Sequence, residues 1–572
     1  YIDMSKPYMV TLAAGTTSPF QLENDEVAIK EDSSDTGKAI AQKNKEKTQK
    51  KTADKPDTTV EVKIDETGLT DRIESLPVAP GNYYNLTATN EGLYYVAASF
   101  RTPGHLKFFD LKVKKETETG DINSYSISNN QKKIIFKKGD DFFIEDVSKI
   151  KIEAKNKLNL SGLKINTDLH AEWKQIFDES WRQMRDYFYD PNMHGVNWKA
   201  MHDKYAVLLP YVNHRNDLTY IIGEMIGELS IGHAYVNSGD RPEAERIKMG
   251  LLGATFSRDK SGYYKIDSIL SGESWDKTLV SPLRQPGVNV KKGDYIISIN
   301  GKDVSRLDNI YQALIGKANQ AIEILVNSKA SATGSRKVFV KPIDDESNLY
   351  YHEWVQQNIA KVTKASGGKI GYLHIPDMGP EGLNQFARYF YPQLDKEALI
   401  IDDRGNGGGN VSPMIIERLR RVPGLGTMMR NAKTANIKPD AQVGPKICLI
   451  DQYSASDGDL FPYQFQFYKI GPLLGQRTWG GVVGIRGSLP FIDGADMRKP
   501  EFAHFAADGS KFVIEGYGVD PDIEVVNDPH QEYLGNDIQL LRAIEEMKRK
   551  LAEPGPKGVP PIPAFPDKSG KK

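Results

Sequence analysis

The stretch KICLIDQYSASDGDLFPYQFQFY, residues 446–468, decides the fold. An apolar run, KICLI, leads directly into a polar turn that contains Ser456, and a run with the apolar spacing of a helix follows. Such a strand-to-helix turn exposes a serine hydroxyl beside free helix N–H groups, which can stabilise a developing oxyanion. Ser456 is therefore a candidate nucleophile. Gly458 fits a nucleophile elbow, but Ser454 stands where a second glycine is usual, so an ordinary helix cap is at least as good a reading.

Apolar strands and helical segments alternate around this stretch, from residue 346 to 553. The runs KIGYLHI (369–375) and EALIID (397–402) are typical of strands, and the helical segment between them predicts an α/β layer. A glycine-rich stretch, DDRGNGGGNVS (402–412), again follows a strand directly. Its glycines allow close approach of backbone N–H groups to a ligand, so this loop is a candidate second oxyanion donor. A flexible turn is the more common use of such glycines, and the Gly-Lys-Ser/Thr signature of a phosphate loop is absent.

Two titratable residues elsewhere in the chain complete the candidate chemistry. His233 lies in GELSIGHAYV (227–236), where a predicted helix ends and a short apolar run begins. Glu515 lies beside a glycine in VIEGYGVDPDIEV (513–525), a predicted apolar strand in which a buried carboxylate needs a partner. Taken alone, an isolated histidine is more often a packed or surface residue, and a surface position is the ordinary reading of the glutamate.

The whole chain is predicted to be a multidomain α+β protein. Short strands with turn signals near the N-terminus suggest antiparallel four-stranded units of a propeller, interrupted by a Lys-rich insertion loop at 24–58. The run KKGDYIISINGKDV (291–304) has the turns of a PDZ domain. The predicted order is a partial β-propeller at 1–165, a helical domain with His233 at 166–246, a PDZ-like domain at 247–345, an α/β domain at 346–553 and a Pro-rich tail at 554–572.

Composition limits the partners of this protein. Its 572 residues include 75 Lys and Arg against 76 Asp and Glu, so no overall field favours nucleic acid or an anionic membrane. No apolar run approaches the roughly 18 to 20 residues that span a bilayer. Cys448 is the only cysteine, which excludes an internal disulfide and a multi-cysteine metal site. The chain begins at Tyr1 without a leader, so we expect a processed or truncated piece.

Together these stretches closely resemble the tricorn proteases and their bacterial homologues, relatives of the carboxy-terminal processing proteases. The resemblance runs in order through YDPNMHGVNW (189–198), the PDZ-like segment, GKIGYLHIPDMG (368–379), the glycine-rich loop, the Ser456 turn, GQRTWGG (475–481) and GYGVDPDIEV (516–525). It implies a serine peptidase for oligopeptides or unfolded chains, with no cofactor and no metal ion. It also implies a homo-oligomer, a hexamer among the tricorn proteases. The implied location is cytoplasmic, or periplasmic if a signal peptide has been removed upstream.

By motif, the resemblance assigns Ser456 as the nucleophile, His233 as the general base and Glu515 as the group that orients the imidazole. The base must then come from the helical domain, which predicts an active site at an interdomain cleft. One residue departs from the family. Tricorn proteases carry a serine directly before the catalytic histidine, and here that position is Gly232. Ser230 or a water would have to link Glu515 to the imidazole instead.

The same resemblance assigns the oxyanion hole to the backbone N–H of Asp457 and that of Gly408 or Gly409. Relatives with a serine–lysine dyad take their lysine from the motif that corresponds to GQRTWGG. The matching position here is Gly481, so the lysine mechanism is not available at this site. This comparison favours His233 as the base.

Two other functions remain open from the sequence. One is a catalytically weakened scaffold whose propeller and PDZ-like modules bind peptides, a reading motivated by Gly232. A metallohydrolase is more distant, because His194, His202 and His214 lack the spacing of a His-Glu-x-x-His motif. Tricorn proteases also carry an acid that favours basic side chains before the cut. No Asp or Glu occurs at 418–439, so we do not expect that preference here.

Overall fold

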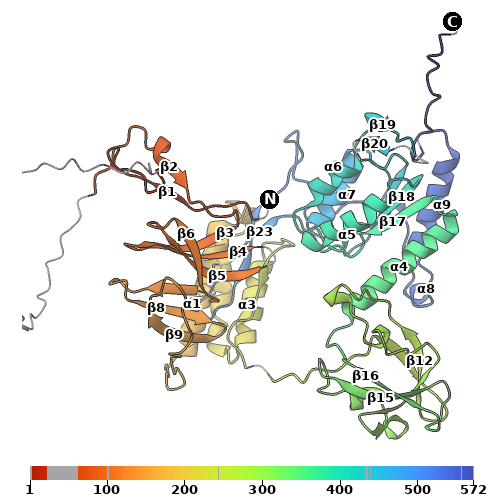
Figure 1. The fold of residues 1–572 in the computed structure, drawn as a ribbon, viewed down its shortest axis with the longest axis horizontal. Helices are drawn as coiled ribbons and strands as arrows, with labels where there is room; N and C mark the ends of the chain where they lie inside the picture. The colour runs from red at the N-terminus through yellow and green to blue at the C-terminus, as the bar shows by residue number, and fades with distance from the viewer. Residues whose placement is uncertain are drawn as a thin grey trace, which may run out of the picture. The chain divides into compact units, whose positions relative to one another are not determined.

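Figure 1 shows a computed structural model of the chain. The chain forms two compact units, Tyr1–Asn166 and Thr167–Lys572. The insertion loop predicted at 24–58 lies outside the described residues. Within those residues, no helix combines the length and the apolar character that a bilayer crossing requires. The structure describes residues 3–21, 62–99, 102–122, 124–242, 244–431, 436–438, 440–487, 489–555 and 557–570.

The first unit is built from antiparallel sheets. A four-stranded meander, β3-β4-β5-β6, is followed by a three-stranded sheet, β7-β8-β9, and β1 pairs with β2. Alternate side chains of both larger sheets, among them Val96, Phe108 and Phe136, meet in one hydrophobic core. The strands are β1 (Tyr8–Val10), β2 (Ile73–Ser75), β3 (Asn82–Ala88), β4 (Gly92–Ser99), β5 (Thr102–Asp110), β6 (Lys115–Gly120), β7 (Ser124–Ile127), β8 (Lys133–Lys138) and β9 (Asp141–Asp146). The prediction of a mixed helix and sheet fold is confirmed for the chain as a whole, whereas the propeller stays a prediction.

The second unit starts with a helical layer, α1 (Leu169–Tyr187), α2 (Trp198–Ala206) and α3 (Arg215–Gly227). Its hydrophobic core also takes in Phe491 and Met497, which come from the other end of the chain. Strand β10 (Tyr235–Val236), just after His233, pairs with β24 (Met497–Phe502), which in turn pairs with β23 (Gly484–Arg486). An ion pair of 2.6 Å between Arg215 Nε and Asp493 Oδ2, with side chains 3% and 2% exposed, joins the same two segments.

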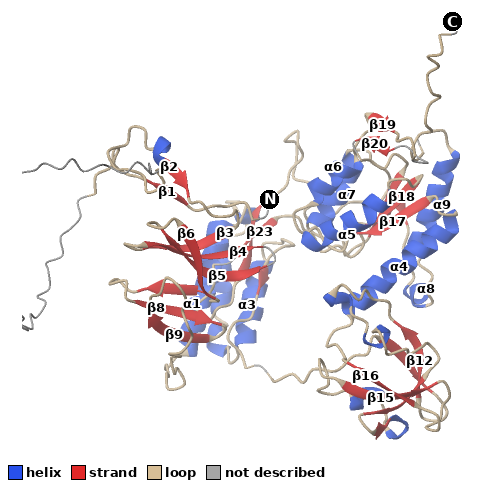
Figure 2. Ribbon diagram, in the orientation of Figure 1, coloured by secondary structure: helices blue, strands red, loops and turns tan. Residues whose placement is uncertain are grey.

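Residues 254–340 form a separate sheet with its own core, drawn as red arrows in Figure 2. Its strand order is β11-β12-β13-β15-β16, and β14 pairs with β13 at the turn that the Asn-Gly signal predicts. All these pairs are antiparallel. The strands are β11 (Ala254–Arg258), β12 (Tyr264–Ile269), β13 (Tyr295–Ile299), β14 (Lys302–Asp303), β15 (Ile322–Asn327) and β16 (Arg336–Val340).

A parallel sheet carries the Ser456 turn. Its strand order is β17-β18-β21-β22-β25, which follows the sequence order. One face packs on α5, α6 and α7, and the other packs on α4 and α9 (Figure 1). In such sheets ligands bind at the carboxyl ends of the strands. The strands are β17 (Ile370–His374), β18 (Ala398–Asp402), β21 (Lys446–Ile450), β22 (Leu473–Gly475) and β25 (Ile523–Glu524).

The helices of this part follow the predicted alternation with strands. Helix α9 begins after its cap Asp537, whose carboxylate accepts the N–H of Leu540. The described part of the Pro-rich tail contains no helix or strand. The remaining elements are α4 (Ser347–Ser366), α5 (Pro380–Phe390), α6 (Ser412–Leu419), the hairpin β19 (Leu425–Thr427) and β20 (Asn436–Lys438), α7 (Asp457–Phe467), α8 (Pro529–Tyr533) and α9 (Ile538–Ala552).

Candidate active site

Ser456 sits at the N-terminus of α7 with an unusual backbone. Its φ is 58° and its ψ is −118°, a region that non-glycine residues rarely enter. Ser456 is the N-cap of α7 in a capping box with Asp459, but ordinary N-cap residues lie in the β region, so its backbone is unusual for a helix cap. Backbone strain of this kind clusters at functional sites. The residue is partly buried and lies at the positive end of α7.

The glycine-rich loop packs directly against the Ser456 turn. A Cβ placed on Gly408, whose φ is +92°, would lie 2.6 Å from the Cβ of Ser456. Gly408 donates its N–H to Asn406 Oδ1 at 2.9 Å, so that N–H is already engaged. In the described part of the chain, no acceptor is recorded for the N–H of Gly409 or of Asp457. The motif did not decide between Gly408 and Gly409 as the oxyanion donor. Of the two, Gly409 is the one whose N–H has no recorded acceptor in the described part of the chain.

Two carboxylates, those of Asp459 and Glu515, hold the loop at residues 478–483 through its backbone. Asp459 accepts the N–H of Ser456 at 2.9 Å and that of Gly480 at 2.8 Å. Burial raises the pKa of Asp459 to about 6. Further along the same loop, Glu515 accepts the N–H groups of Val482 and Val483 at 2.7 and 2.9 Å. The sequence analysis did not single out Asp459, although it belongs to the same YSASDGD motif as Ser456.

The second oxygen of Glu515 reaches the histidine segment, but not the imidazole. Glu515 Oε1 accepts the N–H of Gly232 at 3.2 Å. Glu515 itself lies on a turn and not in a strand, which corrects the sequence reading. The turn follows from the backbone of its neighbours, because Ile514 and Gly516 have φ values of 73° and 75°, which an extended strand does not allow. The next strand, β25, begins only at Ile523.

His233 is 8% exposed and lies near Trp479, with ring centroids 5.7 Å apart and the rings tilted by 48°. Its Nδ1 is buried and has no hydrogen-bond partner among the described residues. Burial lowers the pKa of His233, and the nearby charge of Glu515 partly opposes this shift. The imidazole is therefore held neutral, the form that a general base requires. Ser230, the residue considered as a link to Glu515, is exposed and makes no such bond.

The loop at 478–483 is the common neighbour of Ser456 and His233. Asp459 ties it to Ser456, Glu515 ties it to Gly232, and Trp479 contacts the imidazole. For the two described side chains, the structure records no hydrogen bond between Ser456 and His233. Catalytic hydrogen bonds are often loose without substrate and tighten in the Michaelis complex.

Gly481 stands where the serine–lysine relatives carry their lysine, and the space beside it is filled. A Cβ on Gly481 would lie 2.1 Å from the six-membered ring of Trp479. The indole thus takes the space that a side chain at this position would need. This steric observation agrees with the sequence argument against a lysine base.

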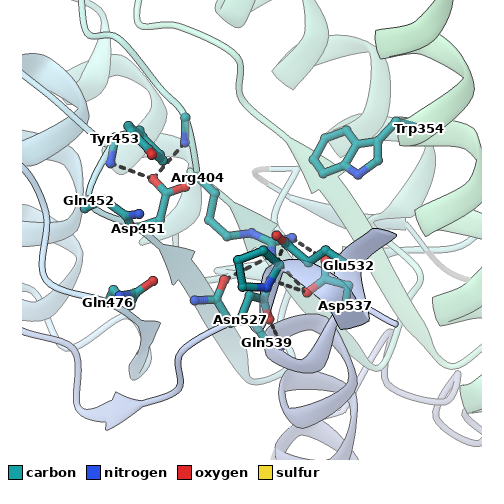
Figure 3. Close-up of a pocket in the computed structure, with 12 residues that line it drawn as sticks. Trp354, Arg404, Asp451, Gln452, Tyr453, Gln476, Asn527, Glu532, Asp537 and Gln539 are labelled. Carbon is teal, nitrogen blue, oxygen red and sulfur yellow. Dashed lines mark hydrogen bonds and ion pairs between the residues drawn. The ribbon is translucent and has the colours of Figure 1, made fainter. Parts of the chain in front are cut away.

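Two polar networks anchor the loops that lead into the site, and both line a cavity of about 370 Å³ at the carboxyl ends of the strands (Figure 3). Asp451 Oδ1 accepts the N–H groups of Gly405 and Tyr453, each at 3.0 Å. It therefore joins the root of the glycine-rich loop to the root of the Ser456 turn. Arg404 pairs with Asp402 at 2.6 Å and with Asp537 at 2.8 Å, which fixes the end of β18 against the start of α9.

The three histidines considered as metal ligands are used locally. His194 bonds Tyr189, His202 bonds Asp178, and His214 accepts the N–H of Asn216 at the start of α3. Among the described residues, no group of three or more His, Cys, Asp or Glu side chains could hold a metal ion.

Three family models match the chain in the order that the fold suggests. The tricorn protease C1 domain matches residues 169–227, the tricorn protease PDZ domain matches 250–345 and peptidase family S41 matches 369–525. The part of the chain with the parallel sheet is thus a peptidase domain of family S41.

Whole-chain comparisons give the more particular assignment. Tricorn protease homolog 1 of Streptomyces coelicolor is 32% identical over 98% of this chain and 53% of that protein. The tricorn protease of Thermoplasma volcanium is 32% identical over 82% of this chain and 46% of that protein. A crystal structure of the tricorn protease superimposes with a TM-score of 0.79 at 30% identity, over 87% of this chain and 49% of that chain. The chain belongs to the tricorn protease family, and it spans about half the length of these relatives.

The contact between the glycine-rich loop and Ser456 can be tested by adding one methyl group. We expect Gly408→Ala to lower kcat by about 100-fold or more, because its Cβ would collide with the Ser456 turn and its φ of +92° disfavours alanine. Gly407→Ala is the matched control, since its Cβ would meet nothing within 4 Å. Peptide hydrolysis and thermal unfolding should be measured for both. Equal activity of the two variants would contradict the contact.

Proposed function

We propose that the chain is a serine peptidase that hydrolyses oligopeptides or unfolded polypeptides through an acyl-enzyme. The observation that carries this proposal is the strained turn of Ser456, with its hydroxyl at a helix N-terminus, packed against a glycine-rich loop that leaves one N–H free. Membership of the tricorn protease family supports it. The scaffold alternative does not account for a nucleophile-like backbone that nothing else in the fold requires.

In the proposed reaction, Ser456 Oγ attacks the scissile carbonyl while His233 takes the hydroxyl proton. The carbonyl oxygen becomes an oxyanion, which the N–H groups of Asp457 and Gly409 stabilise. The tetrahedral species collapses when the imidazolium returns the proton to the leaving amine. Water then attacks the acyl-enzyme by the same route, which releases the second product and frees Ser456.

We assign Glu515 as a positioning residue that acts on His233 in two ways. Its hydrogen bond to the N–H of Gly232 holds the backbone next to the histidine. Its negative charge favours the imidazolium that forms during attack, because it raises the pKa that burial lowers. Neither effect needs a serine between Glu515 and the imidazole. Position 232 is a glycine, which has no hydroxyl, and Nδ1 of His233 has no hydrogen-bond partner among the described residues.

Three further assignments rest on the family resemblance alone. We propose that the sheets of the first unit belong to a β-propeller. We also propose that the chain works in a homo-oligomer, which is a hexamer among the tricorn proteases. The third proposal is that it works in the cytoplasm. Peptide substrates follow from the proposed chemistry, and the absence of acidic residues at 418–439 argues against a basic preference before the cut.

A fluorophosphonate probe tests the proposed nucleophile directly. We expect the folded protein to be labelled at Ser456, and the Ser456→Ala variant to be neither labelled nor active on a peptide library. Heat-unfolded protein is the control, because labelling should require the folded site. Labelling of Ser456→Ala at the wild-type rate, or hydrolysis by that variant, would overturn the assignment.

The missing relay can be restored and measured. A side chain at Gly232 would meet Glu515 Oε1 at 3.5 Å and Gly481 Cα at 3.3 Å, so a serine fits with a small adjustment. We expect Gly232→Ser to raise kcat up to about tenfold over Gly232→Ala, because its hydroxyl can accept from His233 Nδ1 and strengthen the imidazolium. The alanine variant supplies the same Cβ without the hydroxyl. Equal kcat for the two variants would show that Nδ1 needs no acceptor.

The charge of Glu515 should be visible in the pH profile. The acidic limb of kcat/KM reports protonation of His233 in the free enzyme, and we expect it below pH 6.5 because burial lowers the pKa of the imidazole. Glu515→Gln removes the charge that raises this pKa, so the limb should move to a still lower pH while kcat falls. A limb that moves to higher pH in the variant would contradict the assigned role.

A further inference from the structure

Asp403 follows β18 and is completely buried beneath the candidate site. Its backbone joins the strand to the Ser456 turn, because its N–H donates to Leu449 O at 2.9 Å and its carbonyl accepts Ser454 Oγ at 2.8 Å. Its side chain has one recorded hydrogen bond, from Asn406 Nδ2 to Oδ1 at 2.9 Å. The other oxygen, Oδ2, is buried without a partner among the described residues. None of the roles assigned above uses this carboxyl group.

The surroundings of Asp403 are negative. The carboxylates that act on it come from three elements: Asp402 at the end of β18, Asp451 before the Ser456 turn and Asp459 on α7. The thiol of Cys448 on β21 also faces this group, and burial raises the pKa of that thiol. The adjacent cation, Arg404, directs its guanidinium to Asp402, Asp537 and Gln539.

A buried carboxylate oxygen without a donor is too costly to remain charged, and such a group takes up a proton instead. Burial and the neighbouring carboxylates raise the pKa of Asp403 well above its usual range. In the protonated form, Oδ1 still accepts from Asn406, and Oδ2 carries the proton. The recorded hydrogen bond is therefore compatible with the uncharged acid.

Asn406 connects Asp403 to the glycine-rich loop through its side-chain amide. It is completely buried, and its Nδ2 also donates to Ile375 O at 3.1 Å. Its Oδ1 accepts the N–H of Gly408 at 2.9 Å, and its backbone carbonyl accepts the N–H of Ala455 at 2.8 Å. One residue thus fixes both neighbours of the site: its side chain holds Gly408, which precedes Gly409, and its backbone carbonyl holds Ala455, which precedes Ser456.

We propose that Asp403 is a positioning residue, kept as an uncharged carboxylic acid, that acts through Asn406 to hold the oxyanion donor of Gly409 in register with Ser456. The catalytic part of this proposal rests on the peptidase function proposed above, whereas the uncharged state of Asp403 does not. A charged Asp403 would lie beside three carboxylates with Oδ2 buried and without a donor, so repulsion would displace it together with the Asn406 amide that it holds.

Two substitutions separate this role from simple packing. Asp403→Asn keeps the shape, because the amide oxygen can accept from Asn406 and the amide nitrogen replaces the protonated oxygen. We expect its kcat to stay within about twofold of wild type. Asp403→Ala removes the acceptor, and we expect kcat to fall about 10- to 100-fold with little change in KM, as for a misplaced oxyanion donor. Equal losses of kcat in both variants would overturn the positioning role.

Two measurements that need no peptidase activity test the uncharged state. The infrared C=O band of a protonated carboxylic acid should be present at pH 8 in the wild type, where Asp459 with its pKa of about 6 is largely ionised, and should be weaker in Asp403→Asn. Absence of such a band in the wild type would contradict the proposal whether or not the variants fold. An unchanged band in a folded Asp403→Asn variant would contradict it as well.

The pH dependence of stability gives the second measurement. The folded wild type keeps a proton that its unfolded chain releases above pH 4, so its stability should fall relative to Asp403→Asn as pH rises from 5 to 8. The ratio of their unfolding constants should change by about tenfold per pH unit. A ratio independent of pH would mean that Asp403 is ionised in the folded protein. If Ser456 proves not to be a nucleophile, the kinetic comparison fails while both of these results stand.

Discussion

The candidate site depends on two carboxylates that bind the backbone of one loop. Both accept N–H groups from residues 478–483. Asp459 also accepts the N–H of Ser456, and Glu515 also accepts that of Gly232. Hydrogen bonds to a carboxylate are shorter and stronger than neutral ones. The loop is thereby held between the segment that carries Ser456 and the segment that carries His233.

His233 is positioned by a second constraint, the shared core of the helical layer and the late strands. Phe491 and Met497 complete the core around α1 and α3, and β24 pairs with the strand just after His233. Between β22 and β25 the chain leaves the parallel sheet, and its residues 484–502 pack on the helical layer before it returns to the sheet. His233, on the segment that pairs with β24, is thereby brought close to the sheet. Without this excursion of the chain, Ser456 would have no segment carrying His233 beside the loop at 478–483.

The sequence predicted those features that depend on local pattern. The alternating apolar strands indicated the α/β part, and the turn signals in KKGDYIISINGKDV indicated the PDZ-like sheet. The Ser456 turn and the glycine-rich loop stood out because polar or glycine residues follow a strand directly. The helical segment was recognised from apolar spacing, but its completion by Phe491 and Met497 was not, because contacts across some 300 residues leave no local pattern.

The finer geometry of the site also escaped the sequence. Glu515 was expected in a strand, because the apolar residues around it outweigh the glycines, and the positive φ of Ile514 is a tertiary effect. The choice between Gly408 and Gly409 depends on the side chain of Asn406, which only the folded loop brings into place. The most direct test is a crystal structure of the Ser456 phosphonate adduct. We expect the phosphonyl oxygen to accept the N–H groups of Asp457 and Gly409, with His233 Nε2 within hydrogen-bonding distance of Ser456 Oγ. An adduct in which the imidazole lies many ångströms from that oxygen would contradict the account.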